Sequence, residues 1–151
     1  MLHRRDFVLS LCATGLVATA CQSGPPKPSS VVLNFAGEKG MNSGPDGSDR
    51  PVTVMIFRLR STGKFNSADY FALQSNAAGT LGADLIGQDQ VAVAPGRTAS
   101  KAVMVEADAA AIGLVALLRQ PNGRNWRVTK SVSPGSKITV NVRLGAGGIS
   151  A

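Results

Sequence analysis

The fold of this chain is decided by the stretch VTVMIFRLR, which runs from Val52 to Arg60. Its large apolar side chains fall on both alternating faces, and its β-branched and aromatic residues favour a strand. A strand that is apolar on both faces has to be covered on both sides. The stretch therefore predicts a central strand in a layered β structure.

Other short strands are predicted on either side of this one. The clearest has one buried face, because Ile138, Val140, Val142 and Leu144 alternate with polar residues. Further strands are predicted at residues 31–35, 90–94, 101–106, 112–119 and 126–132, with a helix as the competing interpretation of 112–119. About seven short strands separated by turn residues are typical of an antiparallel β-sandwich.

A long loop is expected between the first two strands. Residues 36–49 are dense in Gly, Asn, Ser, Asp and Pro. A loop of this length inside a compact domain is often functional, and an inert insertion is the alternative.

A short helical element is predicted after the central strand. Asn66 or Ser67 would cap a helix that reaches residue 73, with Asp69 in its first turn and Phe71 among the side chains that dock it. A second turn is expected within residues 81–86.

The first twenty residues have the pattern of an export leader. Arg4 and Arg5 precede an apolar stretch of about 14 residues, which suits a signal peptide and is shorter than the about 20 residues needed to span a bilayer. A buried core helix is the alternative, but small residues end the stretch and a Pro-rich segment follows it. Arg4-Arg5-Asp6-Phe7 resembles a twin-arginine signal, and the sequence leaves this route and an ordinary secretory leader open.

A lipidation site is predicted where the leader ends. Ala18-Thr19-Ala20-Cys21 resembles the lipobox of bacterial lipoproteins, in which small side chains precede the scissile bond and the thiol takes the diacylglycerol. Two or three acyl chains on Cys21 would hold the chain in a membrane, since one chain alone binds only marginally. Gln22, where inner-membrane lipoproteins usually carry Asp, points to the outer membrane by resemblance to that sorting rule.

These features divide the chain into four parts. We expect a signal peptide over residues 1–20, a lipidated tether over 21–30, a β-sandwich domain over 31–146 and a flexible tail over 147–151. The tether holds three prolines, which favour a semi-extended chain. The tail is expected to fray because it is rich in glycine and lies at a terminus.

The residue inventory argues against catalysis. The only histidine, His3, lies in the leader together with Cys12, and lipidation would consume Cys21. The exported domain would then have no histidine base, thiol nucleophile or thiolate ligand, so neither a metal nor a cofactor is expected. A carboxylate pair such as Asp84 and Asp89 is the remaining enzymatic possibility, although loop or cap positions explain these acids more simply.

The charge of the chain does not indicate nucleic-acid binding. The formal net charge is +7, and it becomes +6 once Arg4, Arg5 and Asp6 leave with the signal peptide. The basic residues are scattered, and one Trp and one Tyr offer little surface for base stacking. A solvated basic surface, with or without anionic lipid nearby, is the simpler interpretation.

Several ordered stretches resemble the TssJ (SciN/VasD) family of outer-membrane lipoproteins of type VI secretion systems. They are Arg50–Ser61, Ala68–Leu73, Leu81–Asp89, Ile112–Ala116 and Trp126-Arg127. The resemblance implies a transthyretin-like β-sandwich with added helical turns and no enzymatic activity. It also implies that the chain recruits the periplasmic part of the inner-membrane protein TssM and, with TssL, helps to form an envelope-spanning complex.

In that family the loop between the first two strands is the expected contact with TssM. Here this loop is the long insertion over residues 37–49. The candidate partner-binding residues lie near its middle, with Met41 as an apolar plug: Gly40, Met41, Asn42, Ser43, Gly44, Pro45, Asp46 and Gly47. A lipoprotein that binds a glycan or small molecule is the alternative function. Such sites usually display exposed aromatic side chains, whereas Tyr70 and Trp126 are expected to be half-buried packing residues.

Overall fold

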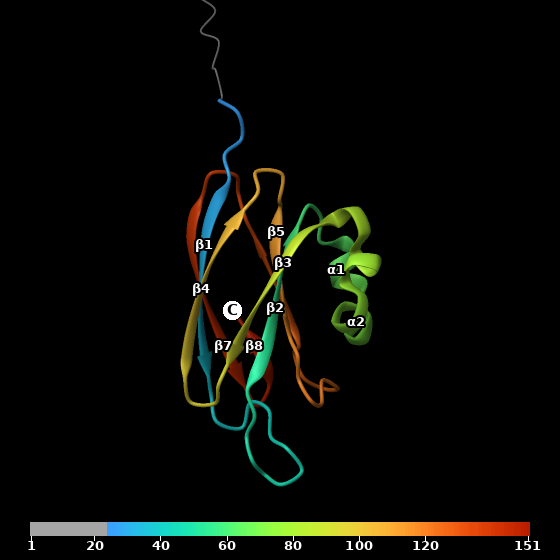
Figure 1. Ribbon diagram of the computed structural model, residues 1–151, viewed down its shortest axis with the longest axis vertical. Helices are drawn as coiled ribbons and strands as arrows, with labels where there is room; N and C mark the ends of the chain where they lie inside the picture. Colours follow the sequence, from blue (N-terminus) through green and yellow to red (C-terminus); the bar gives the residue numbers. More distant parts are fainter. Residues whose placement is uncertain (1–23) are drawn as a thin grey trace, which may run out of the picture.

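The computed structural model describes residues 24–151, which form two four-stranded sheets packed face to face (Figure 1). The strand orders are β4-β1-β7-β8 and β3-β2-β5-β6. The strands are β1 (Ser29–Gly37), β2 (Val52–Leu59), β3 (Leu85–Val93), β4 (Thr98–Val105), β5 (Ala111–Ala116), β6 (Arg127–Ser131), β7 (Lys137–Gly145) and β8 (Gly148–Ser150). The predicted β-sandwich is confirmed, and the stretch 112–119 contributes most of a strand, β5, rather than a helix, although the strand ends at Ala116. The leader, the lipobox Ala18-Thr19-Ala20 and Cys21 lie outside the described residues.

β2 is the central strand that its sequence predicts. It pairs antiparallel with β3 on one side and β5 on the other. Val54 and Ile56 are fully buried between the two sheets, whereas Phe57 and Leu59 are fully buried under the helical insert. The apolar pattern on both faces of this strand therefore reflects two separate layers that cover it.

The sandwich is not wholly antiparallel, contrary to the prediction. β1 pairs antiparallel with β4 but parallel with β7, in register from Ser30–Lys137 to Gly37–Leu144. β2, which follows β1, and β6, which precedes β7, both belong to the other sheet. The chain therefore crosses between the sheets after β1 and before β7, and it enters both strands from the same end (Figure 1). The direction of pairing depends on these crossings, which the alternation of residues within a strand does not encode.

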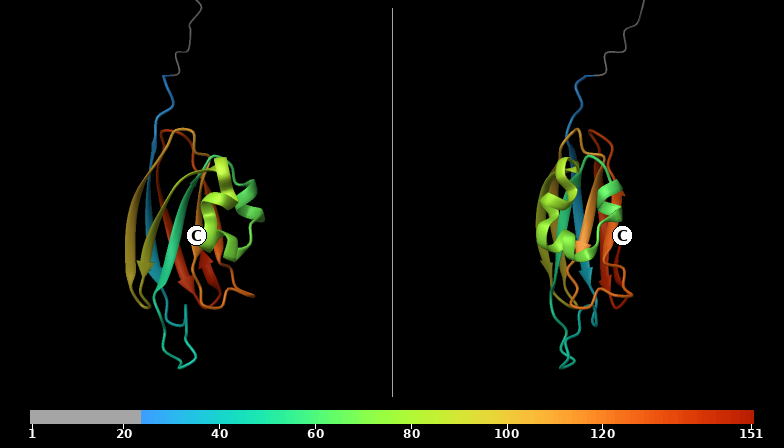
Figure 2. Two further views of the ribbon diagram at one scale, coloured as in Figure 1. Left: turned by 45° about the vertical axis from the view of Figure 1, so that its right-hand side comes forward. Right: turned by 90° about the vertical axis from the view of Figure 1, so that its right-hand side faces the viewer.

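The helical insert covers the outer face of the sheet that contains β2 (Figure 2). It consists of α1 (Gly63–Ser67), α2 (Tyr70–Leu81) and the 3-10 turn η1 (Gly82–Asp84), so it extends well beyond the predicted helix at 66–73. None of the described helices is long and apolar enough to cross a membrane.

Two predicted roles in the insert are wrong. Asp69 is the N-cap of α2 rather than a first-turn residue, and its carboxylate accepts hydrogen bonds from the N–H groups of Phe71 and Ala72 at 2.8 and 3.1 Å. Phe71 is 65% exposed and does not dock the helix. Because the cap begins the helix at Tyr70, the side chain of Phe71 falls on the solvent face.

Phe65 of α1 attaches the insert to the sheet. Its ring lies over Gly113 of β5, where a Cβ atom would come within 2.6 Å of a ring carbon. The ring also meets that of Phe57, with centroids 5.8 Å apart. The missing side chain at Gly113 therefore provides the space that Phe65 fills.

The C-terminal residues are ordered, contrary to the prediction of a flexible tail over 147–151. Gly148–Ser150 forms β8, antiparallel to β7, and Ile149 is 1% exposed within the main core. The N–H group of Ile149 donates to the carbonyl of Asn125 at 2.7 Å. Burial of one large apolar side chain and pairing of its backbone outweigh the glycine-rich composition that suggested fraying.

Charged side chains close the open side of the sandwich between the edge strands β3 and β4. Arg58 reaches from β2 to Asp89 of β3 and to Glu106, whose Oε2 lies 3.0 Å from the arginine Nε. Gly87 leaves room for the guanidinium, which a side chain there would overlap. Charges directed inward at edge strands hinder pairing with strands of other molecules.

The two ends of the sandwich present different segments. Residues 24–28 enter at what we call the proximal end, beside the turns 106–110 and 132–136 (Figure 1). The opposite, distal end consists of the loops 38–51 and 117–126 and the turns 94–97 and 145–147. β1 joins the two ends, and its nine residues separate them by about 30 Å at roughly 3.3 Å per residue. β1 begins at Ser29, inside the predicted tether 21–30, because Ser29 and Ser30 already pair with β4.

Candidate functional site

Asp49 organises the base of the 38–51 loop. Its carboxylate accepts hydrogen bonds from the backbone N–H groups of Gly40 at 2.6 Å and Asn42 at 2.9 Å. Ser43 pairs with Asp49 across the loop. Asp49 is not among the predicted site residues, although aspartate is a residue type that often bonds backbone N–H groups in turns.

The hydrogen bonds to Asp49 make the loop sensitive to acid. Partial burial raises the pKa of this carboxyl, but the N–H groups of Asn42, Gly40 and Arg50 outweigh that effect, and the pKa is lowered from 3.8. A lowered pKa in the folded state stabilises the loop above the unfolded pKa, and this stabilisation is lost as the pH falls through the folded value.

We therefore expect the amide protection factors of Gly40 and Asn42, measured by hydrogen exchange and NMR, to fall about tenfold or more below pH 3.8. The amide of Glu38, which donates to the carbonyl of Leu144 at 2.8 Å, should stay protected and serves as an internal control. In Asp49→Asn the two amides should be weakly protected at every pH. Equal protection of Gly40 and Asn42 at pH 7 in the wild type and in Asp49→Asn would contradict this account.

Two of the predicted partner-binding residues lie inside the molecule. Met41 is fully buried in the core between the sheets, and Asn42 is 7% exposed. The Asn42 side-chain amide donates to the carbonyl of Pro51 at 3.3 Å, and its Oδ1 accepts the N–H of Arg119 at 3.0 Å. Met41 is thus a plug for this chain's own core, and a partner cannot reach it unless the loop opens.

The exposed part of the predicted set is the tip, which we define as residues 43–48. Pro45, Asp46 and Gly47 project into solvent. The N–H of Gly44 donates to the carbonyl of Ser48 at 2.7 Å, and the Ser48 hydroxyl lies 2.8 Å from both carboxylate oxygens of Asp46. The tip therefore has a defined shape although it protrudes from the domain.

The loop 117–126 supports the base of the tip from the side. Arg124 donates from Nε to the carbonyl of Ala146 and from Nη2 to the carbonyl of Gly145, both at 2.9 Å, and it also bonds the carbonyl of Met41. A guanidinium carries several fixed donors and so suits the bridging of three carbonyls. No local pattern indicates this role of Arg124, because its partners Met41 and Gly145 are far from it in the sequence.

The described residues do not assemble the acid pair that was the enzymatic alternative. Asp84 ends η1, whereas Asp89 lies five residues further along β3 and contacts Arg58. Five extended residues span roughly 16 Å, beyond the about 5–9.5 Å between the carboxyls of glycosidase pairs. Residues 24–151 contain no cluster of three or more His, Cys, Asp or Glu side chains placed to hold a metal.

The aromatic side chains that a glycan site would need are used for packing. Tyr70 is 7% exposed, and its hydroxyl donates to the carbonyl of Leu118 at 2.9 Å. Trp126 packs edge-on against Tyr70 with ring centroids 5.3 Å apart, and Arg127 lies over the indole. Both roles agree with the sequence-based expectation.

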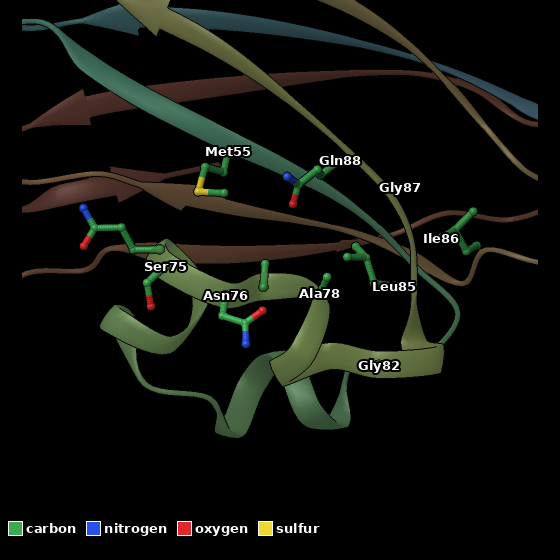
Figure 3. Close-up of a pocket in the computed structure, with 11 residues that line it drawn as sticks. Met55, Ser75, Asn76, Ala78, Gly82, Leu85, Ile86, Gly87 and Gln88 are labelled. Carbon is green, nitrogen blue, oxygen red and sulfur yellow. The ribbon is translucent and has the colours of Figure 1, made fainter.

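An open groove of about 470 Å³ lies between α2 and the start of β3 (Figure 3). Asn76 leaves the helical conformation there, and its Oδ1 accepts the N–H of Gly79 at 3.0 Å. Met55, Ser75 and Gln88 also line the groove, and its described lining contains neither an aromatic ring nor a charged group. The groove therefore does not favour the ligand-binding alternative.

Comparison with known proteins agrees with this fold. A family model described as type VI secretion lipoprotein (SciN, VasD, EvfM, TssJ) matches residues 29–147. The chain is similar to Serratia marcescens Lip, described as a membrane-bound component of the type VI secretion system, with 25% identity and a TM-score of 0.75 over 80% of this chain and 95% of that one. It is similar to the lipoprotein TssJ1 of Pseudomonas aeruginosa with 29% identity and a TM-score of 0.73 over 83% of this chain and 95% of that one.

Two further solved structures share the fold alone. One is a chain in a type VI membrane complex, with 23% identity and a TM-score of 0.71. The other is a chain in a structure described as the TssM C-terminal domain from EAEC, with 22% identity and a TM-score of 0.68. Each match covers 80% of this chain and 95% of the other. No curated protein matches the chain.

The family match begins at the first residue of β1 and ends between β7 and β8, so it takes in almost the whole sandwich, the helical insert and the tip. It confirms the resemblance that the separate sequence stretches indicated. This chain belongs to the family of type VI secretion lipoproteins that includes TssJ and VasD.

Proposed function

We propose that this chain is a structural lipoprotein, anchored through acylated Cys21 at the periplasmic face of the outer membrane, and that its distal end docks the periplasmic part of TssM. The observation that carries the proposal is the placement of the tether and the tip at opposite ends of one rigid sandwich (Figure 1). A lipid at the proximal end would direct the tip away from the membrane and into the periplasm.

The proximal contacts favour a short connection to the membrane. The carbonyl of Lys27 accepts the N–H of Gly135 at 2.8 Å, and the Ser29 hydroxyl donates to the carbonyl of Ser133 at 2.7 Å. If the signal peptide ends at residue 20, the segment 21–26 before these contacts spans at most about 20 Å. The sandwich would therefore remain close to the bilayer.

The distal contacts favour a docking role for the tip. Its base is fixed by Asp49, Asn42 and Arg124, so little conformational entropy would be lost when a partner binds. Confinement of both proteins in the periplasm raises their effective concentration, so a modest interface is enough to hold a complex together. Chains of this fold also occur in the type VI membrane complex and in the structure described as the TssM C-terminal domain.

We further propose that the chain is not an enzyme. Asp89 and Glu106 are engaged by Arg58, Asp108 is paired with Arg60, and Asp49 is used by the backbone of the loop. Engagement of these carboxylates by arginines and N–H groups suits a structural protein better than acid–base chemistry.

The test is to exchange the tip without disturbing its base. Replacing residues 44–48 by Asn-Gly joins the paired residues Ser43 and Asp49 through a two-residue hairpin turn and keeps Met41 and Asn42 in place. We expect capture of the TssM periplasmic region by the full-length lipoprotein to weaken about thirtyfold or more, as when central interface residues are removed, while Tm stays within about 2 °C.

The matched control is Ser133→Ala with Pro134→Ala, which alters an equally exposed turn at the proximal end. Capture by this control should equal that of the wild type. Wild-type capture by the tip exchange would refute docking through the tip. A deletion of residues 40–47 is less informative, because it also removes the buried Met41 and Asn42.

A further inference from the structure

The distal end carries an excess of positive charge. Its loops and turns hold five basic and three acidic side chains: Lys39, Arg50, Arg97, Arg119 and Arg124, against Glu38, Asp46 and Asp49. The proximal segments 24–28, 60–62, 82–84, 106–110 and 132–136 hold two basic and three acidic side chains: Lys27 and Arg60, against Asp84, Glu106 and Asp108. The charge of this domain is therefore distributed unevenly along its long axis.

Contacts within the distal end leave the excess cations uncompensated. Glu38 pairs with Arg143 at 2.6 Å, Asp46 pairs with Arg50 at 3.7 Å, and Asp49 accepts backbone N–H groups. The guanidinium of Arg124 is bonded only to carbonyls. Within residues 24–151, the side chains of Lys39, Arg97 and Arg119 form no ion pair, and all three are exposed.

These three cations come from three separate segments that meet near the base of the tip. Lys39 lies in the loop itself. Arg97 lies in the turn 94–97, and its carbonyl accepts the N–H of Gly37 at 2.8 Å. Arg119 donates its N–H to Asn42 at 3.0 Å. The hydrogen bonds hold the backbones of these segments together, so the three exposed side chains extend from fixed backbone positions at the distal end.

We infer that the distal end is a cationic platform, formed by Lys39, Arg97 and Arg119 around the tip, that binds an acidic surface of the protein partner. This inference rests on the proposed docking function and names the chemistry of the surface that is docked. Lipid of the anchoring membrane is a poor candidate for the group that these cations bind, because the tether holds the other end of the domain, about 30 Å away. Complementary charge of this kind mainly raises the association rate and fixes the orientation of docking.

The test compares two triple variants of equal net charge. The platform variant carries Lys39→Gln, Arg97→Gln and Arg119→Gln. The control carries Lys27→Gln, Lys64→Gln and Lys137→Gln, which are equally exposed but lie outside the distal end. Association of the full-length lipoprotein in detergent with the immobilised TssM periplasmic region is measured at 50 mM and 500 mM NaCl.

We expect the platform variant to associate about tenfold more slowly than the control at 50 mM NaCl, with the difference shrinking below about twofold at 500 mM as salt screens the charges. Equal association rates and equal salt dependence for the two variants would overturn the platform. If the tip exchange abolishes capture at both salt concentrations while the platform variant behaves as the control, docking stands and only the platform fails. If the wild type does not bind the TssM region at either concentration, both proposals fall.

Discussion

Gly113→Val should destabilise the domain by about 3 kcal/mol or more and lower Tm by roughly 10 °C, measured by thermal and urea unfolding. A Cβ at this position would lie 2.6–2.9 Å from three carbons of the Phe65 ring, which is itself fully buried. The ring cannot retreat without displacing its neighbour Phe57 and the buried cluster to which both belong, so we expect the insert to lift from the sheet. A loss of this size is a large fraction of the about 5–15 kcal/mol that holds a typical domain together.

Two comparisons isolate the cause of that loss. Gly147→Val is the matched control, because no atom lies within 4 Å of a Cβ at Gly147 and its φ is not positive. Phe65→Ala is the partner variant: if overlap with the ring is responsible, Gly113→Val should cost much less in the Phe65→Ala background than in the wild type. An equal cost in both backgrounds would show that Gly113 is needed for another reason.

The sequence predicts the layered fold well where the apolar faces of a strand show which of its sides are covered. The two apolar faces of β2 predict two covering layers, and the single apolar face of β7 predicts one. The parallel pairing of β1 with β7 is not predictable in this way, because it follows from crossings between sheets that residues far apart in the chain determine together.

The sequence predicts a long loop between β1 and β2, but it does not predict how that loop is built. Its length and composition distinguish it from a tight turn, yet nothing in the local sequence separates the buried Met41 from the exposed Pro45 four residues later. Asp49 lies within the loop, but Arg119 and Arg124, which also fix its base, lie more than seventy positions from the residues they bond. Burial in a loop is decided by such distant contacts, and a single sequence does not reveal them.

The proposed geometry places the membrane and the protein partner at opposite ends of the sandwich. Pro45 lies in the tip, and Ser133 lies in the turn 132–136, whose Gly135 donates its N–H to the carbonyl of Lys27. Because about 30 Å separates the two ends, a partner that contacts one cannot at the same time contact the other through the same small interface. A contact-dependent probe at these two positions should therefore give nearly all-or-none signals.

The most direct measurement is photo-crosslinking in living cells with a photoreactive amino acid placed at Pro45 or at Ser133 of the full-length lipoprotein, with TssM detected by immunoblot. The account predicts a strong TssM adduct from position 45 and none above background from position 133. An adduct from position 133 without one from position 45 would contradict it, since TssM would then meet the domain at its membrane side.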